Sequence, residues 1–121
     1  MSAGRHIVLV GHGSRAPEAN ALLVHLAEQM ASDLRAPVTP GYLEMTTPTI
    51  PDALRAAIAA GAERITVVPY FLSPGVHVAR DIAAAVDTVR AQAQIEIDVA
   101  VFLGAHPEIP RLLAEIAAAP P

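Results

Sequence analysis

Short apolar runs alternate with longer amphipathic segments along this 121-residue chain. The runs are rich in β-branched residues and predict strands at residues 5–10, 38–44, 65–71 and 95–101. The longer segments have apolar residues at helical spacing and predict helices that begin near Pro17, near Pro51, after Gly75 and near Pro107. This order predicts an α/β fold: a four-stranded parallel sheet with right-handed crossovers and helices on both faces.

The same pattern predicts which side chains face the core. In the first helix these are Leu22, Leu23, Leu26, Met30 and Leu34, and in the last helix they are Ile109, Leu112, Leu113 and Ile116. The third strand has the composition of a strand that is buried on both faces. The second strand contains Pro40-Gly41, so we expect it at an edge of the sheet or beside a bulge.

Composition limits the classes of function. A hydrophobic fraction of 53% with 17% charged residues favours one folded domain over residues 1–121. A net charge of −4 and 3% aromatic residues argue against a nucleic-acid partner. The chain has no cysteine, which excludes a disulfide framework, a thiolate nucleophile and a zinc ribbon. No apolar segment is long enough for a membrane span and no signal-peptide layout is present, so we expect a cytoplasmic protein without a membrane partner.

Three residues with metal-binding side chains follow three predicted strands. His12 follows the first strand, Glu44 the second and His77 the third, where His77 lies in a loop or in the first turn of a helix. Because the carboxyl ends of parallel strands share one edge of the sheet, these side chains are expected to face one cleft. Two imidazoles and a carboxylate suit a divalent ion such as iron, cobalt, nickel or zinc.

Polar residues near these positions are candidates for binding a ligand with carboxylate groups. Arg15 and Arg80, with Ser14 and Ser73, can bind carboxylates at the rim of the cleft. Asp81 lies one helical turn beyond His77 and is a candidate to orient its ring. The other histidines are expected elsewhere: His6 and His25 in solvent, and His106 at the start of the last helix.

Each residue also has a simpler interpretation: a turn histidine, a solvated carboxylate or a surface arginine. A second pattern, Gly11-x-Gly13-x-x-Ala16, fits a relaxed dinucleotide-binding fingerprint between a strand and a helix. Against it, the chain has only half of a dinucleotide-binding fold, and Pro17 directly follows the pattern. His77 also has no role in that interpretation.

Five segments of the chain form recognisable motifs: VLVGHGSR at residues 8–15, YLE at 42–44, GAERITVVPY at 61–70, VVPYFLSPGVHVARDI at 67–82 and LGAHP at 103–107. Together they resemble the motifs of the small CbiX-type sirohydrochlorin chelatases. The resemblance implies a chelatase-like fold, comparable to half of a flavodoxin-like domain, and insertion of Co²⁺ or Fe²⁺ into sirohydrochlorin on the way to cobalamin or sirohaem. It also implies that His12 and His77 bind the metal substrate, with Glu44 as a third ligand or acid/base group.

The resemblance further implies a homodimer, because longer members of the family carry two such domains in one chain. No organic cofactor is expected. The chemistry is compatible with these residues, since metal insertion must dehydrate an ion, hold it and remove two pyrrole protons. A tetrapyrrole or metal carrier without catalytic activity is the alternative on the same fold.

Overall fold

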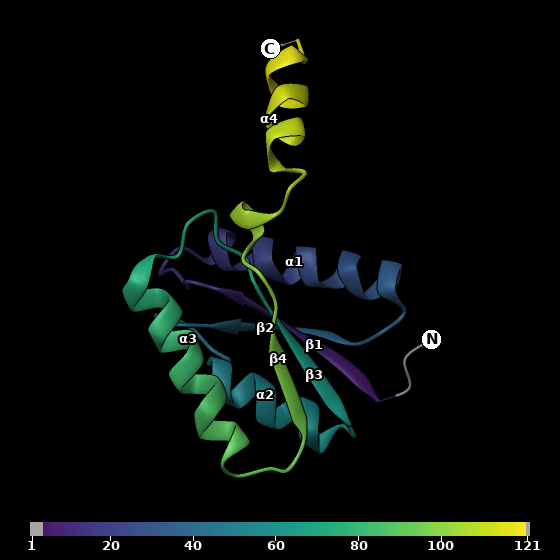
Figure 1. The fold of residues 1–121 in the computed structure, drawn as a ribbon, viewed down its shortest axis with the longest axis vertical. Coiled ribbons are helices and arrows are strands. Elements are labelled where there is room, and N and C mark those ends of the chain that lie inside the picture. The colour runs from purple at the N-terminus through teal and green to yellow at the C-terminus, as the bar shows by residue number, and fades with distance from the viewer. Residues whose placement is uncertain (1–3, 121) are drawn as a thin grey trace.

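The computed structural model describes residues 4–120, which form a parallel sheet with its helices arranged as Figure 1 shows. The strands are β1 (Arg5–Gly11), β2 (Val38–Tyr42), β3 (Arg64–Pro69) and β4 (Glu96–Val99). The helices are α1 (Pro17–Leu34), α2 (Ile50–Ala59), α3 (Gly75–Arg90) and α4 (Ile109–Ala118), with a short 3₁₀ turn, η1 (Leu103–Ala105), before α4. All neighbouring strands are parallel and their order is β2-β1-β3-β4, which confirms the predicted α/β fold.

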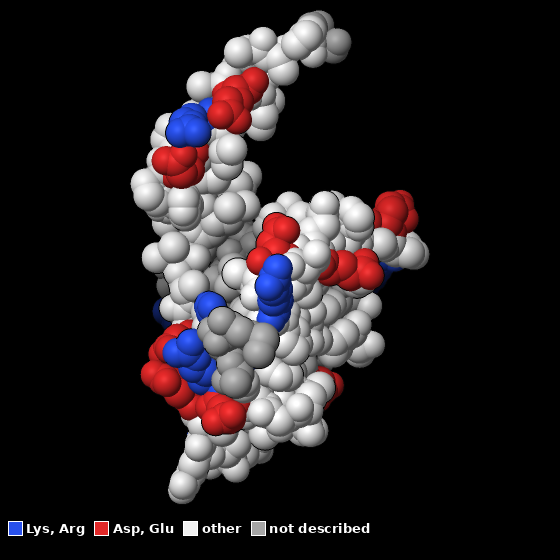
Figure 2. Space-filling view, turned by 90° about the vertical axis from the view of Figure 1, so that its right-hand side faces the viewer, with Lys and Arg blue, Asp and Glu red and all other residues white. Residues whose placement is uncertain are grey.

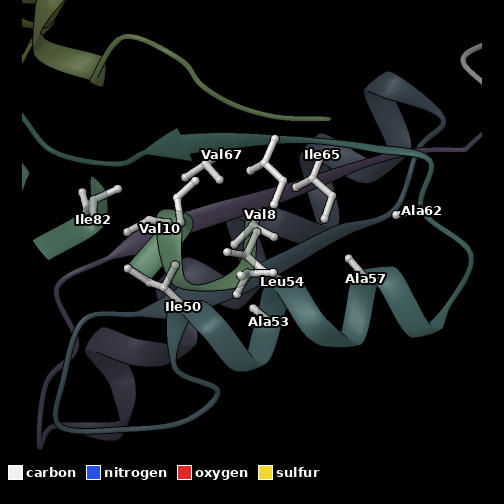
Figure 3. Packing of buried hydrophobic residues seen from close by; sticks show 13 residues of the cluster. Val8, Val10, Ile50, Ala53, Leu54, Ala57, Ala62, Ile65, Val67 and Ile82 are labelled. Carbon is white, nitrogen blue, oxygen red and sulfur yellow. The ribbon is translucent and has the colours of Figure 1, made fainter. Parts of the chain in front are cut away.

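The two faces of the sheet carry different helices. On one face, α2 and α3 cover a large apolar cluster in which Val8, Val67 and Leu54 are fully buried. Figure 3 shows this cluster, with side chains from the strands pointing toward α2. On the other face α1 covers a smaller cluster around Leu9 and Leu23. Helices therefore lie on both faces, but they cover them unequally.

The predicted edge position of the second strand is confirmed, because β2 pairs only with β1 within the sheet. The strand ends at Tyr42 rather than at Glu44. Residues 43 and 44 nevertheless continue the pairing with the end of β1 and the loop after it: the Leu43 N–H donates to the Gly11 carbonyl at 3.0 Å, and the Glu44 N–H to the His12 carbonyl at 3.1 Å. This extension fixes the loop after β1 beside the loop after β2.

Two helix starts and one helix end lie where the sequence favours them. Helix α1 begins at Pro17, where the missing N–H of proline costs no hydrogen bond. After α2, Gly61 has a φ of 102°, the left-handed conformation that ends many helices. The third predicted helix begins at Gly75, which places His77 in its first turn.

Several predicted core positions are wrong. In α1, Leu23 is buried, but Leu22 and Leu34 are about half exposed. The third strand is buried on the α2–α3 face only, since Thr66 and Val68 are half-buried. The last strand ends at Val99, and Val99 and Val101 are exposed. Thr66 and Val68 remain half-buried because α1 packs mainly on β1 and β2 and does not extend over the other half of the sheet.

The prediction for the last helix is wrong in a different way. Its helical spacing is correct, but none of its residues is buried, and Leu112, Leu113 and Ile116 are 47%, 60% and 71% exposed. Figure 1 shows α4 projecting away from the sheet rather than packing on it. None of the helices within residues 4–120 is both long enough and apolar enough to cross a membrane.

Candidate active site

His12 and Glu44 meet at the carboxyl edge of the sheet. The pairing of the two loops after β1 and β2 places them side by side, and His12 Nε2 lies 3.1 Å from Glu44 Oε1. Both side chains are more than half exposed, at 56% and 55%. The pair is therefore open to a ligand, and an imidazole nitrogen and a carboxylate oxygen are both ligands for divalent transition metals.

The backbone around this pair is tightly constrained. Gly13 has a φ of 95°, and a Cβ atom at this position would lie 1.8 Å from the Glu44 carbonyl oxygen. Met45, directly after Glu44, also has a left-handed φ of 71°, which is uncommon for a residue other than glycine. A glycine at position 13 is thus needed for the loop of His12 to lie against the loop of Glu44.

Two residues outside the predicted site, Asn20 and Tyr42, hold the His12 loop in place. The Asn20 side chain accepts from the Ser14 N–H at 3.0 Å and donates to the Ser14 carbonyl at 2.7 Å. The Tyr42 hydroxyl donates to the Asn20 carbonyl at 2.8 Å. Burial raises the pKa of the Tyr42 phenol above its usual value. An asparagine in the first turns of a helix after a glycine loop is the signal that could have identified Asn20.

Two hollows flank His12. One, of about 180 Å³, is lined by His12, Glu44 and Thr49 and, from α3, by Val78 and Asp81. The other, of about 260 Å³, is bordered by the loop after β1, by α1 and by the aromatic residues Tyr70 and Phe71. His12 is thus positioned between a polar hollow and a more apolar one.

His77 is exposed in the first turn of α3 and lines neither hollow. It lies four residues before Asp81, so the two occupy the same side of α3 one turn apart. Within residues 4–120 no hydrogen bond joins them, and no three His, Asp or Glu side chains are grouped closely enough to hold one ion. The structure thus brings His12 and Glu44 together, whereas a shared ion with His77 stays a prediction.

The rim residues have different environments. Ser14 is half-buried, and its hydroxyl accepts from the Ala16 N–H at 3.0 Å, so it shapes the loop. Ser73, Arg15 and Arg80 are exposed. In the part of the chain that the structure describes, neither arginine forms an ion pair, which leaves both guanidinium groups available to an acidic ligand.

The remaining histidines are separate from this edge. His106 Nδ1 accepts from the Glu108 N–H at 3.0 Å, which confirms its expected place at the start of the last helix. His25 is exposed on α1, as expected, whereas His6 is half-buried in β1 rather than in solvent. His12 is therefore the histidine that borders the candidate site directly.

Similar proteins share both sequence and fold with this chain. The sirohydrochlorin cobaltochelatase of Methanocaldococcus jannaschii is 51% identical over 77 residues, which are 63% of this chain and 54% of the relative. The chloroplastic sirohydrochlorin ferrochelatase of Arabidopsis thaliana is 32% identical over 102 residues, 83% of this chain and 45% of that protein. The chain spans about half the length of the curated relatives it matches.

Solved structures of related proteins have the same fold as this chain. A putative cobalamin biosynthesis CbiX protein from Marinobacter aquaeolei superposes with a TM-score of 0.82 at 26% identity, over 93% of both chains. The sirohydrochlorin chelatase SirB from Bacillus subtilis subspecies spizizenii, in complex with cobalt, superposes with a TM-score of 0.81 at 28% identity. The match covers 92% of this chain and 48% of SirB. The sequence model of the CbiX family matches residues 6–119. With nearly its whole length matched, the chain belongs to the CbiX family.

Proposed function

We propose that this chain inserts a divalent cobalt or iron ion into sirohydrochlorin. The observation that carries the proposal is the contact of His12 with Glu44 at the carboxyl edge of the sheet, open to solvent and between two hollows. The names of the relatives support the substrate, since they are a sirohydrochlorin cobaltochelatase and a sirohydrochlorin ferrochelatase. The bound cobalt in the SirB structure supports the choice of metal.

The metal ion is a substrate in this reaction. His12 and Glu44 replace some of its water ligands, and because few protein ligands hold it, the remaining coordination positions stay free for the pyrrole nitrogens. His77 lies one turn before Asp81 on α3 and is proposed as a further ligand, which receives the ion at the rim of the cleft. A chain that offers few ligands also releases the ion readily to the macrocycle.

Insertion replaces two pyrrole protons with one divalent ion, so two protons must leave. Glu44 and the imidazole of His12 are bases within one site, and each can accept a proton as it gives up the ion to the pyrrole nitrogens. Asp81 lines the same hollow as His12 and Glu44 and can pass a proton on to solvent. The exposure of this hollow gives water direct access to these groups.

The carboxylate groups of sirohydrochlorin require positive partners on a chain whose net charge is −4. Arg15 and Arg80 are proposed to supply them, because guanidinium groups bind carboxylates in a bidentate manner. Ser14 and Ser73 can add hydrogen bonds at the same rim, and the N-terminal ends of α1 and α3 add favourable partial charges.

Residues 1–121 are proposed to act as one chelatase unit within a twofold homodimer, since 92% of this chain superposes on only 48% of the longer SirB chain. A location in the cytoplasm stays a prediction. The dinucleotide-binding alternative is disfavoured by the surroundings of Gly13. The space that its missing side chain leaves is filled by the Glu44 carbonyl, so a pyrophosphate has no room there.

The test is an insertion assay that follows the absorbance change of sirohydrochlorin after addition of Co²⁺ or Fe²⁺. The proposal requires an insertion rate well above that of the protein-free reaction. The rate should be strongly reduced in His12→Ala. It should be retained in His25→Ala, the matched control, because His25 is also an exposed histidine but lies on α1. Stoichiometric binding of sirohydrochlorin without turnover would instead identify the carrier alternative. A rise in melting temperature with NAD but not with Co²⁺ would favour dinucleotide binding.

A further inference from the structure

The side-chain amide of Asn20 pairs with the backbone of the loop that carries His12. Its oxygen accepts from the Ser14 N–H at 3.0 Å, and its nitrogen donates to the Ser14 carbonyl at 2.7 Å. One side chain thus satisfies both backbone groups of Ser14, as a residue of a neighbouring strand does in a sheet. Ser14 lies beyond the end of β1 at Gly11, so the Asn20 amide continues the pairing where the sheet has ended.

Asn20 is itself held by Tyr42. The Tyr42 hydroxyl, at the end of β2, donates to the Asn20 carbonyl at 2.8 Å. The Tyr42 ring is buried in the apolar cluster around Leu9 and Leu23, so its position is fixed by packing. We call the side chains of Asn20 and Tyr42 the clamp. The clamp joins the His12 loop to both α1 and β2.

Helix formation does not explain an asparagine at position 20. Asn20 is the fourth residue of α1, within the helix, where asparagine is less favourable than alanine. It is not the N-cap either, since that position is Ala16, which makes no side-chain cap hydrogen bond. Both bonds of its amide go to the preceding loop. What asparagine contributes at this position is therefore the placement of that loop.

The His12 loop is held from two sides. On the β2 side, the Glu44 N–H donates to the His12 carbonyl at 3.1 Å, and the Glu44 carbonyl lies against Gly13. On the α1 side, the clamp holds Ser14. Between them, Gly13 has a φ of 95°, and a glycine can leave this conformation for many others. The clamp excludes those other conformations of the loop.

The placement of the loop matters because His12 and Glu44 come from different loops. An ion bonded to both groups at about 2.0–2.2 Å, with an angle of roughly 90–110° between the bonds, holds the two ligand atoms about 3.0–3.5 Å apart. His12 Nε2 and Glu44 Oε1 are 3.1 Å apart. An ion can therefore take the place of the proton in this contact while both groups stay where they are. A shift of about 1 Å would lose this match, and a misplacement of that size can cost about 100-fold.

We propose that Asn20, anchored by Tyr42, is a positioning residue for the metal substrate: it holds His12 at the separation from Glu44 that one divalent ion requires. The inference rests on the proposed function, in which His12 and Glu44 receive the ion. Asn20 is not itself a ligand, because both polar atoms of its amide contact Ser14. Its effect therefore appears in the affinity for the metal, and only while His12 is present.

The first test is the Kd of Co²⁺ for the chain without sirohydrochlorin, measured by titration. Asn20→Ala should raise this Kd about 10–100-fold. The variant should still fold, because Ser14 is only half-buried and water can replace the two lost hydrogen bonds. Tyr42→Phe should raise the Kd several-fold, since it releases the Asn20 backbone but keeps the amide. An unchanged Kd in Asn20→Ala would overturn the proposal.

Asn20→Asp separates placement from charge. The carboxylate can accept from the Ser14 N–H but cannot donate to the Ser14 carbonyl, so one of the two bonds is lost. The proposal predicts a Kd for Co²⁺ above that of the wild type. An added negative charge near the site would by itself attract the cation and lower the Kd. A Kd at or below the wild-type value would therefore contradict the proposal.

Gly61→Ala is the matched control for a general loss of stability. Gly61 lies just before β3, at the edge of the sheet where the strands begin, which is the side of the molecule that faces the viewer in Figure 2. His12 lies at the opposite edge. A φ of 102° disfavours alanine at position 61, so the melting temperature should fall. The Kd for Co²⁺ should stay at the wild-type value, and an equal rise in Gly61→Ala and Asn20→Ala would overturn the proposal.

The closing experiment is a double-mutant cycle of Asn20→Ala with His12→Ala, again read as the Kd of Co²⁺. If Asn20 acts through His12, then Asn20→Ala should change the Kd less than about twofold once His12 has been replaced. Equal fold-changes in the two backgrounds would overturn the proposal, because Asn20 would then act without His12.

The same cycle distinguishes this inference from the proposed function. If His12→Ala alone leaves the Kd unchanged, both are rejected. If His12→Ala raises the Kd and Asn20→Ala does not, only the role of the clamp is rejected. If the cycle shows the expected coupling but the chain does not insert metal into sirohydrochlorin, the proposed reaction is rejected and the role of the clamp in metal binding stands.

Discussion

His12 Nε2 lies 3.1 Å from Glu44 Oε1, although 32 positions separate the two residues in the sequence. The contact results from hydrogen bonds that continue the pairing of β1 with β2 beyond the end of both strands. An imidazole and a carboxylate that meet in this way, at an exposed edge, can share one metal ion or one proton.

Glu44→Gln should slow metal insertion about 100-fold, because it removes a base and an anionic ligand but keeps the shape of the side chain. The melting temperature should change little, since the Glu44 side chain is 55% exposed. Insertion rates of the variant are compared with those of Glu28→Gln, an exposed glutamate on α1. Equal rates in the two variants would show that Glu44 has no part in the reaction.

His77→Ala should slow insertion tenfold or more if His77 receives the ion at the rim, and the loss should be smaller at high metal concentration. His77 is exposed in the first turn of α3, so the fold should be unaffected. The rate is measured against the concentration of Co²⁺, with His25→Ala as the control. An unchanged metal dependence would remove His77 from the mechanism and leave His12 and Glu44.

Gly13→Ala should destabilise the protein by about 2–5 kcal/mol, because the new methyl group meets the Glu44 carbonyl and the φ of 95° disfavours alanine. Gly61→Ala is the matched control: its φ is 102°, but no atom lies within 4 Å of the new methyl group. It should cost about 1–2 kcal/mol. Chemical denaturation measures both values, and equal losses would mean that the close approach of the two loops contributes nothing.

Tyr42→Phe should lower stability by about 1 kcal/mol, since it removes the hydrogen bond to the Asn20 carbonyl. Burial raises the pKa of Tyr42 in the folded state, so the folded chain holds this proton more tightly than the unfolded chain does. The contribution of the protonated Tyr42 phenol to the free energy of unfolding is complete below about pH 10, the pKa of tyrosine in the unfolded chain. It is lost as the pH rises through the higher pKa of the folded chain. Unfolding free energies measured from pH 8 to pH 11 should fall less in Tyr42→Phe than in the wild type.

The sequence predicts the sheet well, because short β-branched runs and helical spacing are local signals. The meeting of His12 with Glu44 is also predictable, since both follow parallel strands and these strands are neighbours. The supporting contacts are not predictable in this way. The hydrogen bonds of Asn20 with Ser14 and Tyr42, and the fit of Gly13 against Glu44, depend on how two loops approach each other in space.

The last helix shows a second limit. Its apolar spacing correctly predicts an amphipathic helix, but spacing does not say which surface covers Leu112, Leu113 and Ile116. Their spacing alone predicts that they pack in the core of their own chain, whereas the structure leaves them exposed. The position of His77 has a similar cause: the strand that precedes it fixes the edge of the sheet on which it lies, but not its distance from His12.

The most direct test of the central claim, that His12 and Glu44 receive the metal substrate, is the location of cobalt in crystals soaked with Co²⁺. Anomalous diffraction at the cobalt edge should give a peak about 2.0–2.2 Å from His12 Nε2 and from a Glu44 oxygen. The peak should be absent from His12→Ala crystals. Cobalt bound to other histidines, with none at His12, would contradict the proposed site.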